Sequence, residues 1–281
     1  MGRMAVALRR FGGLVLMFLI LSGGPASLHA NEMIRINGTG TGLEMMKPLI
    51  RAYIESHPGI RFEMEKPLGS SGAVKALLAG VLDIAVSSKP LRPEEAAEGA
   101  QLRPFGKTPL VIVTGSNVPV TDISTAELEA IYSGRTRKWP NNENIRVVLR
   151  PLEDIDTKIL RELSLGMDEA ITQAQSRRGM MTAVTDPESN QLVADLIGGI
   201  GTSGLAGVLA EKTTLKVLSL NGVMPTVASL KQGRYPLAKK MDLVTLSHIQ
   251  DPVRKFLDFI YSAKGRAIVE SIGVLTSTGG Q

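Results

Sequence analysis

The sequence predicts an α/β protein, and two observations point to this class. Short apolar runs alternate with longer helical stretches, and several of these runs lead into turns rich in Gly, Ser and Thr that open a helix. The 281 residues are 43% hydrophobic and 21% charged, which supplies a substantial core and excludes collagen-like and disordered classes. At this length we expect one large domain or two lobes.

The first 30 residues have the pattern of a secretory signal: a basic start, an apolar stretch over 11–22 and a short run ending at Ala30. Cleavage after Ala26 and an uncleaved anchor stay open, and the Arg9-Arg10 pair is a weak indication of a twin-arginine signal. Without this segment the chain has 29 basic and 27 acidic residues, so its net charge falls from +5 to +2. That balance gives no argument for a nucleic-acid partner. We expect an exported, periplasmic protein.

The residue inventory disfavours an enzyme. The chain has no cysteine, which excludes disulfides, thiolate metal sites and a cysteine nucleophile. The phosphate-loop, G-x-S-x-G and H-E-x-x-H motifs are missing, and His57 and His248 have no metal-ligand spacing. We therefore expect no catalytic residue, no metal and no cofactor.

The amino-terminal third predicts a regular alternation of strand and helix. A His-Pro-Gly run at 57–59 ends the first helix. The expected strands are Met33–Ile36, Ile60–Glu65 and Leu82–Val86, and the expected helices run from Leu43 to about Ser56 and from Gly69 to about Ala79.

The rest of the chain continues this pattern. Ser124 and Glu127 predict a capping box at a helix start, and a Gly-rich bend is expected at 199–204 between two helices. The expected strands are Leu110–Thr114, Ile145–Leu149, Leu215–Leu220 and Met241–Leu246. The expected helices are Ser124 to about Tyr132, one from about Thr157, Pro187 to about Leu196, Leu205 to about Lys212 and Asp251 to about Ser271.

Two turns are candidate anion sites. Gly38–Gly42 and Gly69–Gly72 each open a predicted helix, where backbone N–H groups are free and the helix dipole is positive. Ser87-Ser88 follows the next strand. Small residues allow a ligand to approach the backbone. Plain helix caps are an equal alternative for these turns.

The loop after the 145–149 strand contains a basic and an acidic candidate. The guanidinium of Arg150 has paired donors that suit an oxyanion or a carboxylate, although a surface ion pair with Glu153 or Asp154 would also explain it. Asp154 and Asp156 could act in acid–base chemistry or bind a metal. Because no histidine is near, the sequence favours a solvated turn for these two aspartates.

The segment Gly199–Gly204 matches G-x-G-x-x-G by letter. The dinucleotide fingerprint requires a preceding strand and an acidic residue about 20 positions later. Here a helix is expected before the segment, and 218–221 contains no acid. Nucleotide binding is therefore disfavoured.

Three segments resemble the phosphate-binding proteins of bacterial ABC phosphate importers, and the most specific is the G-S-S-G-x-V-K element. They are Gly38–Leu43, Leu68–Lys75 and Asp83–Leu91, and the likeness continues at Thr108–Val113 and at Leu128–Arg135 with Trp139. The resemblance implies a divergent member with the α/β, two-lobed type II fold of periplasmic solute-binding proteins, its lobes joined by two crossing strands. The implied parts are a signal at 1–30, a first lobe of 31–113 and 235–281, and a second lobe of 114–234.

The resemblance also implies a set of ligand-binding positions, from which this chain departs. The family's Thr-Phe is missing at Gly42-Leu43, so only backbone donors are assured there. The carboxylate that accepts the proton of hydrogen phosphate falls on Ser88, and the usual Gly-Ser-Gly-Thr after the arginine is replaced at 153–157. The implied positions are Thr41, Gly42, Leu43, Ser70, Ser71, Ser88, Arg150, Asp156 and Thr157.

These departures leave three possibilities. The acidic loop turns away from the ligand, Asp154 or Asp156 replaces the missing proton acceptor, or the chain binds another anion such as sulfate, molybdate, tungstate or an organic anion. The resemblance implies a monomeric extracytoplasmic solute-binding protein that captures an oxyanion, phosphate first, for an ABC permease at the inner membrane. A periplasmic sensor and an enzyme on the same fold are the alternatives. The cofactor-carrying transferase of this fold attaches its cofactor through cysteine, which this chain lacks.

Overall fold

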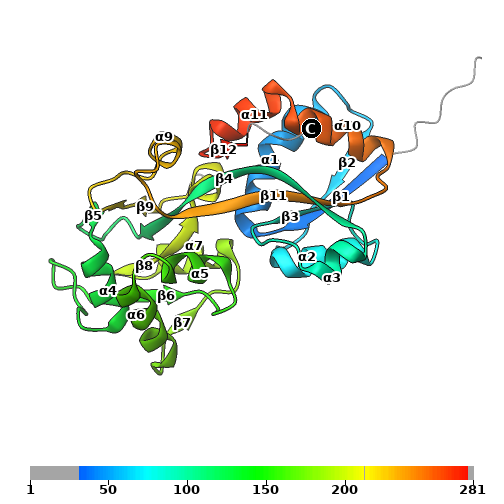
Figure 1. The fold of residues 1–281 in the computed structure, drawn as a ribbon. Helices are drawn as coiled ribbons and strands as arrows, with labels where there is room; N and C mark the ends of the chain where they lie inside the picture. The colour runs from blue at the N-terminus through cyan, green and yellow to red at the C-terminus, as the bar shows by residue number, and fades with distance from the viewer. Residues whose placement is uncertain (1–31, 212, 278–281) are drawn as a thin grey trace, which may run out of the picture. The chain divides into compact units, whose positions relative to one another are not determined.

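We describe residues 32–211 and 213–277 of a computed structural model of the chain (Figure 1). The predicted signal at 1–30 lies outside the described residues. Within these two ranges no helix has both the length and the apolar character needed to cross a membrane.

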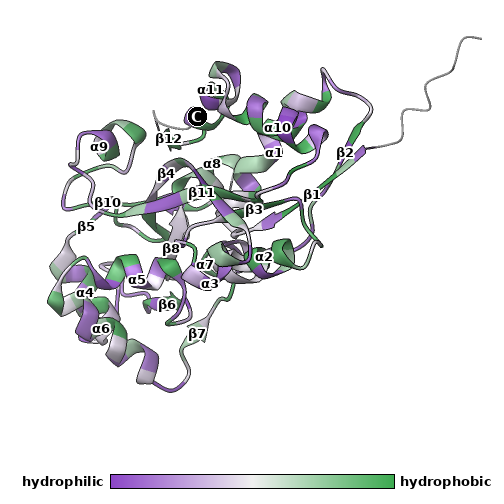
Figure 2. Ribbon diagram, turned by 45° about the vertical axis from the view of Figure 1, so that its right-hand side comes forward, coloured by the Kyte–Doolittle hydropathy of each residue, from purple (hydrophilic) through white to green (hydrophobic). Residues whose placement is uncertain are grey.

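The first lobe has a parallel sheet at its centre. Strand β1 (Glu32–Gly38) pairs with β2 (Ile60–Glu63) on one side and with β3 (Ile84–Ser87) on the other. Its core gathers around Ile34, Met45 and Phe256, all fully buried. Bands of hydrophobic and hydrophilic residues alternate along α10, whose apolar side packs on this core (Figure 2). The helices are α1 (Gly40–Ile54), α2 (Gly69–Leu78), α3 (Pro93–Ala97), α10 (Asp251–Tyr261) and α11 (Ala263–Glu270).

The second lobe continues the same sheet. Strand β8 (Gly199–Gly204) pairs with β6 (Arg146–Leu149), which pairs with β7 (Met181–Thr182). Strands β5 (Asp122–Ile123) and β10 (Ser219–Leu220) form a separate pair. The helices are α4 (Thr125–Ser133), α5 (Ile155–Arg161), α6 (Leu165–Ser176), α7 (Asp186–Asp195), α8 (Leu205–Glu211) and α9 (Val227–Lys231).

Two long antiparallel strands connect the lobes, as Figure 1 shows. Strand β4 (Ala100–Thr114) pairs with β11 (Ala238–Leu246) from Ala100↔Leu246 to Pro109↔Ala238. The last residues of β4, Leu110–Thr114, pair with β8 and β9 (Lys216–Val217). Near the middle of β4, Gly106 and Lys107 also pair with β12 (Leu275–Thr276). The predicted two-lobed α/β fold with two crossing strands is confirmed.

Several predicted boundaries are corrected. Strand β4 has 15 residues, three times the predicted length, because the unpredicted part, Ala100–Pro109, pairs with β11. The strand expected at 215–220 is two short strands with different partners. The last helix breaks at Ser262, which has ψ 164° and whose hydroxyl accepts the Gly265 N–H at the start of α11. The helix starts at Ser124 and Gly69 are confirmed.

The glycine-rich bend expected at 199–204 is wrong, because these residues form the fully buried strand β8. A Cβ at Gly201 would lie 2.8 Å from Val193 Cγ2, and one at Gly204 would lie 2.5 Å from Thr41 Cγ2. These glycines therefore permit close packing of helices on the strand. The G-x-G-x-x-G letters do not form a phosphate-binding turn here.

Candidate functional site

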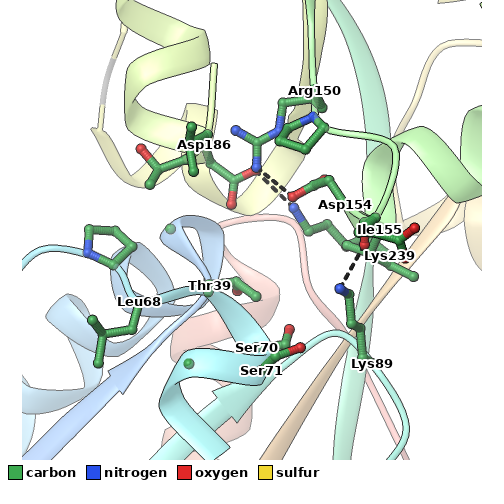
Figure 3. A pocket seen from close by; sticks show the side chains of 18 residues that line it. Thr39, Leu68, Ser70, Ser71, Lys89, Arg150, Asp154, Ile155, Asp186 and Lys239 are labelled. Atoms are coloured by element: carbon green, nitrogen blue, oxygen red, sulfur yellow. Dashed lines mark hydrogen bonds and ion pairs between the residues drawn. The ribbon is translucent and has the colours of Figure 1, made fainter. Parts of the chain in front are cut away.

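A pocket of about 200 Å³ is lined by residues of both lobes and of β11 (Figure 3). Ser70, Ser71 and Leu68 come from the start of α2, and Arg150, Asp154 and Asp186 face them from the second lobe. Its lining consists of Thr39, Gly40, 67–72, Lys89, 150–151, 153–155, 184–186 and Lys239. Of the predicted ligand positions, Ser70, Ser71 and Arg150 line this pocket.

The start of α2 presents donors to the pocket. Its N-cap residue Leu68 makes no side-chain cap, so side chains leave the first N–H groups of the helix free. The Oδ1 atom of Asn37 fixes the preceding turn by accepting the Leu68 N–H at 2.9 Å. Ser70 Oγ accepts the Ser88 N–H at 3.0 Å, which leaves the Ser70 hydroxyl proton available to donate. An anion is the natural partner for such a helix start.

The start of α1 is already satisfied by the protein. Thr41 N donates to Asp186 Oδ2 at 2.8 Å, and Gly42 N donates to Thr39 Oγ1 at 3.1 Å. Leu43 N donates to Thr39 O at 2.9 Å. The three predicted ligand positions at 41–43 are buried and do not line the pocket. A carboxylate of the second lobe thus takes the place at α1 where we expected an external anion.

Arg150 lies directly after β6 and is 5% exposed. Its guanidinium donates to Asp154 Oδ2 at 2.9 Å and to Ala183 O at 3.3 Å, and lies 3.6 Å from Asp186 Oδ1. Its Nε is buried without a hydrogen-bond partner in the described part of the chain. The ion pair with Asp154 that we considered as an alternative is present, but its expected surface location is wrong, because the pair is largely buried at the pocket wall.

The solvated turn expected for both aspartates is also wrong. Asp156 is fully buried, and its Oδ1 lies 2.7 Å from Lys239 Nζ. Asp154 is the N-cap of α5 and accepts the Asp156 N–H at 2.9 Å. Thr157 is buried beside them and donates its hydroxyl to Arg150 O at 3.2 Å. Asp154 reaches the pocket, whereas Asp156 and Thr157 lie behind its wall.

Sequence reasoning missed Lys239, Asp186 and Lys89. Lys239 is 1% exposed, and its Nζ lies 2.9 Å from Asp186 Oδ1 as well as close to Asp156. Two signals were available: the charge of Lys239 next to the expected strand 241–246, and an aspartate at a helix start after Thr185. Lys89 lies at the rim, where its Nζ donates to Glu153 O at 2.7 Å.

Burial and charge set the ionisation of this cluster. Burial raises the pKa of Asp156 to about 6, against the opposing charge of Lys239. Burial alone would also raise the pKa of Asp186, but the charges of Lys239 and Arg150 and the Thr41 N–H outweigh it and lower that pKa. Although burial opposes it, the Asp156 and Asp186 charges raise the pKa of Lys239. The pocket therefore holds fixed cations and a fixed carboxylate at neutral pH.

The pocket lining has three cations, Lys89, Arg150 and Lys239, and three carboxylates, Glu153, Asp154 and Asp186. Ser88 contributes neither charge nor proton acceptor, because it is 3% exposed and its hydroxyl points to Met241 Sδ at 3.9 Å. No group of three or more metal-ligating side chains is present in residues 32–211 and 213–277. This arrangement can hold a small oxyanion by hydrogen bonds and balanced charge.

Comparison with known proteins gives a consistent result. The family described as "PBP superfamily domain" matches residues 24–264. Among curated proteins, the chain is 26% identical over 255 residues to the phosphate-binding protein PstS of Borreliella burgdorferi, covering 87% of this chain and 90% of the relative. It is 24% identical to PstS of Bacillus subtilis strain 168, over 80% of this chain and 75% of the relative.

The fold also matches solved structures. A putative phosphate ABC transporter substrate-binding protein with bound phosphate from Clostridium perfringens superposes with a TM-score of 0.73 at 20% identity, covering 88% of this chain and 100% of that chain. A phosphate-binding protein from Stenotrophomonas maltophilia gives a TM-score of 0.65 at 14% identity, covering 88% and 91%. At these identities the likeness shows the fold alone.

Proposed function

Since this chain belongs to the PBP superfamily, we propose that it is a solute-binding protein that captures inorganic phosphate outside the cytoplasm and delivers it to an ABC importer. The main observation behind this proposal is the pocket between the uncapped start of α2 and the buried guanidinium of Arg150. The names of the relatives support phosphate as the oxyanion. The proposed protein is an exported monomer whose first lobe is 31–113 and 235–281 and whose second lobe is 114–234.

Each side of the pocket has a role in this proposal. The free N–H groups of α2 and the hydroxyls of Ser70 and Ser71 donate to phosphate oxygens from the first lobe. Arg150 donates from the second lobe with the N–H groups that Asp154 and Ala183 leave free. Burial strengthens these bonds, because few water molecules compete with them.

Hydrogen phosphate also needs an acceptor for its proton, and Ser88 does not face the pocket. Asp154 and Asp186 are the buried or half-buried carboxylates that line it. Each carboxylate oxygen has two lone pairs, so the bonds to Arg150, Lys239 and Thr41 leave room for a ligand O–H. We assign the acceptor role to these two residues and place Asp156 behind them.

The test is calorimetric titration of the purified protein with inorganic phosphate, sulfate and molybdate. Arg150→Gln should weaken phosphate binding about a hundredfold or more, because a buried charged partner of the anion is lost. Ser71→Ala, at an exposed position, should weaken it about tenfold without disturbing the fold. The matched control is Arg234→Gln, an exposed arginine that does not line the pocket. If another oxyanion binds tightly and phosphate gives no heat of binding, the proposed ligand is wrong. If phosphate affinity is the same in all variants, the proposed site is wrong.

A further inference from the structure

A second pocket of about 170 Å³ lies in the second lobe, away from the site between the lobes. Three arginines line it: Arg137 after α4, Arg146 at the start of β6 and Arg177 at the end of α6. Its apolar floor includes Ile131 and Val147, which are nearly fully buried. No Asp or Glu is among the residues that line it. This contrasts with the pocket between the lobes, where carboxylates balance the cations.

The three guanidiniums have unused hydrogen-bonding capacity. A guanidinium has five N–H donors. Arg177 donates to Tyr132 O and Arg137 donates to Gly134 O at 2.9 Å, so both also cap the carboxyl end of α4. The Arg146 side chain makes no hydrogen bond or ion pair within the described ranges, and none of the three arginines pairs with a carboxylate there. Helix capping therefore explains two of the contacts, and most N–H donors of the three guanidiniums remain without a protein partner among the described residues.

Arg177 carries an unbalanced charge in a partly enclosed place. Its Nε is buried without a partner among the described residues. Burial and the charge of Arg137 lower its pKa. Gly134, with φ 80°, is the residue that makes room, since a Cβ there would lie 2.0 Å from Arg177 Nη1. The chain thus brings like charges together over an apolar floor, where an anion would remove their repulsion.

We propose that this pocket is a second binding site, for a small multivalent oxyanion such as inorganic phosphate. Three arginines from three segments line this one pocket, planar guanidiniums suit the oxygens of a tetrahedral anion, and the small volume suits one such group. The two sites lie at opposite ends of β6, since Arg146 is its first residue and Arg150 follows its last. At about 3.3 Å per residue, this separates their Cα atoms by about 13 Å.

The experiment is a phosphate titration of the ¹⁵N-labelled protein followed by amide chemical shifts. The amides of Gly134 and Gly179 report on the arginine pocket, and those of Gly69 and Ser71 report on the pocket between the lobes. We expect saturable shifts of Gly134 and Gly179 that persist in Arg150→Gln. Arg137→Gln combined with Arg146→Gln should weaken this event at least about tenfold, and both positions are exposed, so the fold is kept.

The matched control combines Arg135→Gln with Arg178→Gln. It removes the same charge from exposed neighbours that do not line the pocket. If both double substitutions weaken phosphate binding equally, or if chloride at the same ionic strength reproduces the shifts, the effect is one of surface charge and the second site is wrong. If the amides of Gly69 and Ser71 shift while those of Gly134 and Gly179 do not, the second site is wrong and the proposed function stands. If only Gly134 and Gly179 shift, the proposed function is wrong and the second site stands.

Discussion

The carboxylate of Asp186 accepts the backbone N–H of Thr41 at 2.8 Å and so joins the first turn of α7 to the first turn of α1. Two helix starts, both with positive dipole ends, lie against each other at this point. The negative charge of Asp186 lies between them and also pairs with Lys239. The protein therefore supplies its own anion where the two lobes meet.

Asp186→Asn should destabilise the fold by about 3 kcal/mol. The substitution removes the charge that faces Lys239, Arg150 and the α1 start, and a buried cation that loses a partner is costly. Urea unfolding measures the change. Asp195→Asn, at the exposed far end of the same helix, should change the free energy of unfolding by less than about 0.5 kcal/mol. Equal effects of the two variants would contradict the role of Asp186.

Lys239→Met should cost more than Asp186→Asn. Without the ammonium, Asp156 and Asp186 are two buried carboxylates with no lysine between them, and breaking such a pair costs about 3–5 kcal/mol. The control is Lys240→Met, because Lys240 is the exposed neighbour on the same strand. Unfolding free energies for the three variants give the order. A Lys239→Met protein as stable as the parent would show that the cluster does not stabilise the fold.

Gly40→Ala should weaken the contact between the lobes. A Cβ at Gly40 would lie 2.4 Å from Pro187 Cδ and 2.8 Å from Asp186 Cβ, so α7 would have to move away from α1. Overpacking of this kind costs about 1–3 kcal/mol. Gly59→Ala is the control, since no heavy atom lies within 4 Å of a Cβ there. Thermal unfolding of both variants measures the effect. Equal melting temperatures would contradict the close approach of α7 to Gly40.

Asp156 should make stability fall as pH rises from about 4 to about 6. Its pKa in the folded protein is raised to about 6, so between its unfolded and folded pKa the folded state holds a proton that the unfolded state releases. The penalty is complete above pH 6 and amounts to about 3 kcal/mol. The charged groups facing it are Lys239, Arg150, Asp154 and Asp186.

Asp156→Asn isolates this contribution. Unfolding free energies of the parent and the variant, measured at several pH values between 4 and 7, should diverge in favour of the variant as the pH rises. Asp186 does not interfere in this window, because its lowered pKa places its own loss of stability at more acid pH. Parallel curves would show that Asp156 titrates like an exposed aspartate.

The local elements could be predicted because their signals lie within a few residues. Ser124 and Glu127 form the capping box that their spacing predicts, and the Gly-Ser-Ser-Gly run at 69–72 opens α2. The glycines of β8 misled the prediction because their use is tertiary: each leaves space for a helix that approaches from elsewhere.

The candidate site likewise combines features that could be predicted from local sequence with features that depend on tertiary packing. The sequence alone determined the fold class, and it predicted two turns at helix starts and Arg150 as candidate anion donors, since backbone donors at a helix start and a guanidinium after a strand are local features. Tertiary structure decided that Asp186 satisfies the first turn, that Asp156 is buried and that Lys239 joins them. The Thr41 N–H and the Asp186 carboxylate lie 145 positions apart in the chain. Only packing of the lobes brings Asp156, Asp186 and Lys239 close enough to shift each other's ionisation.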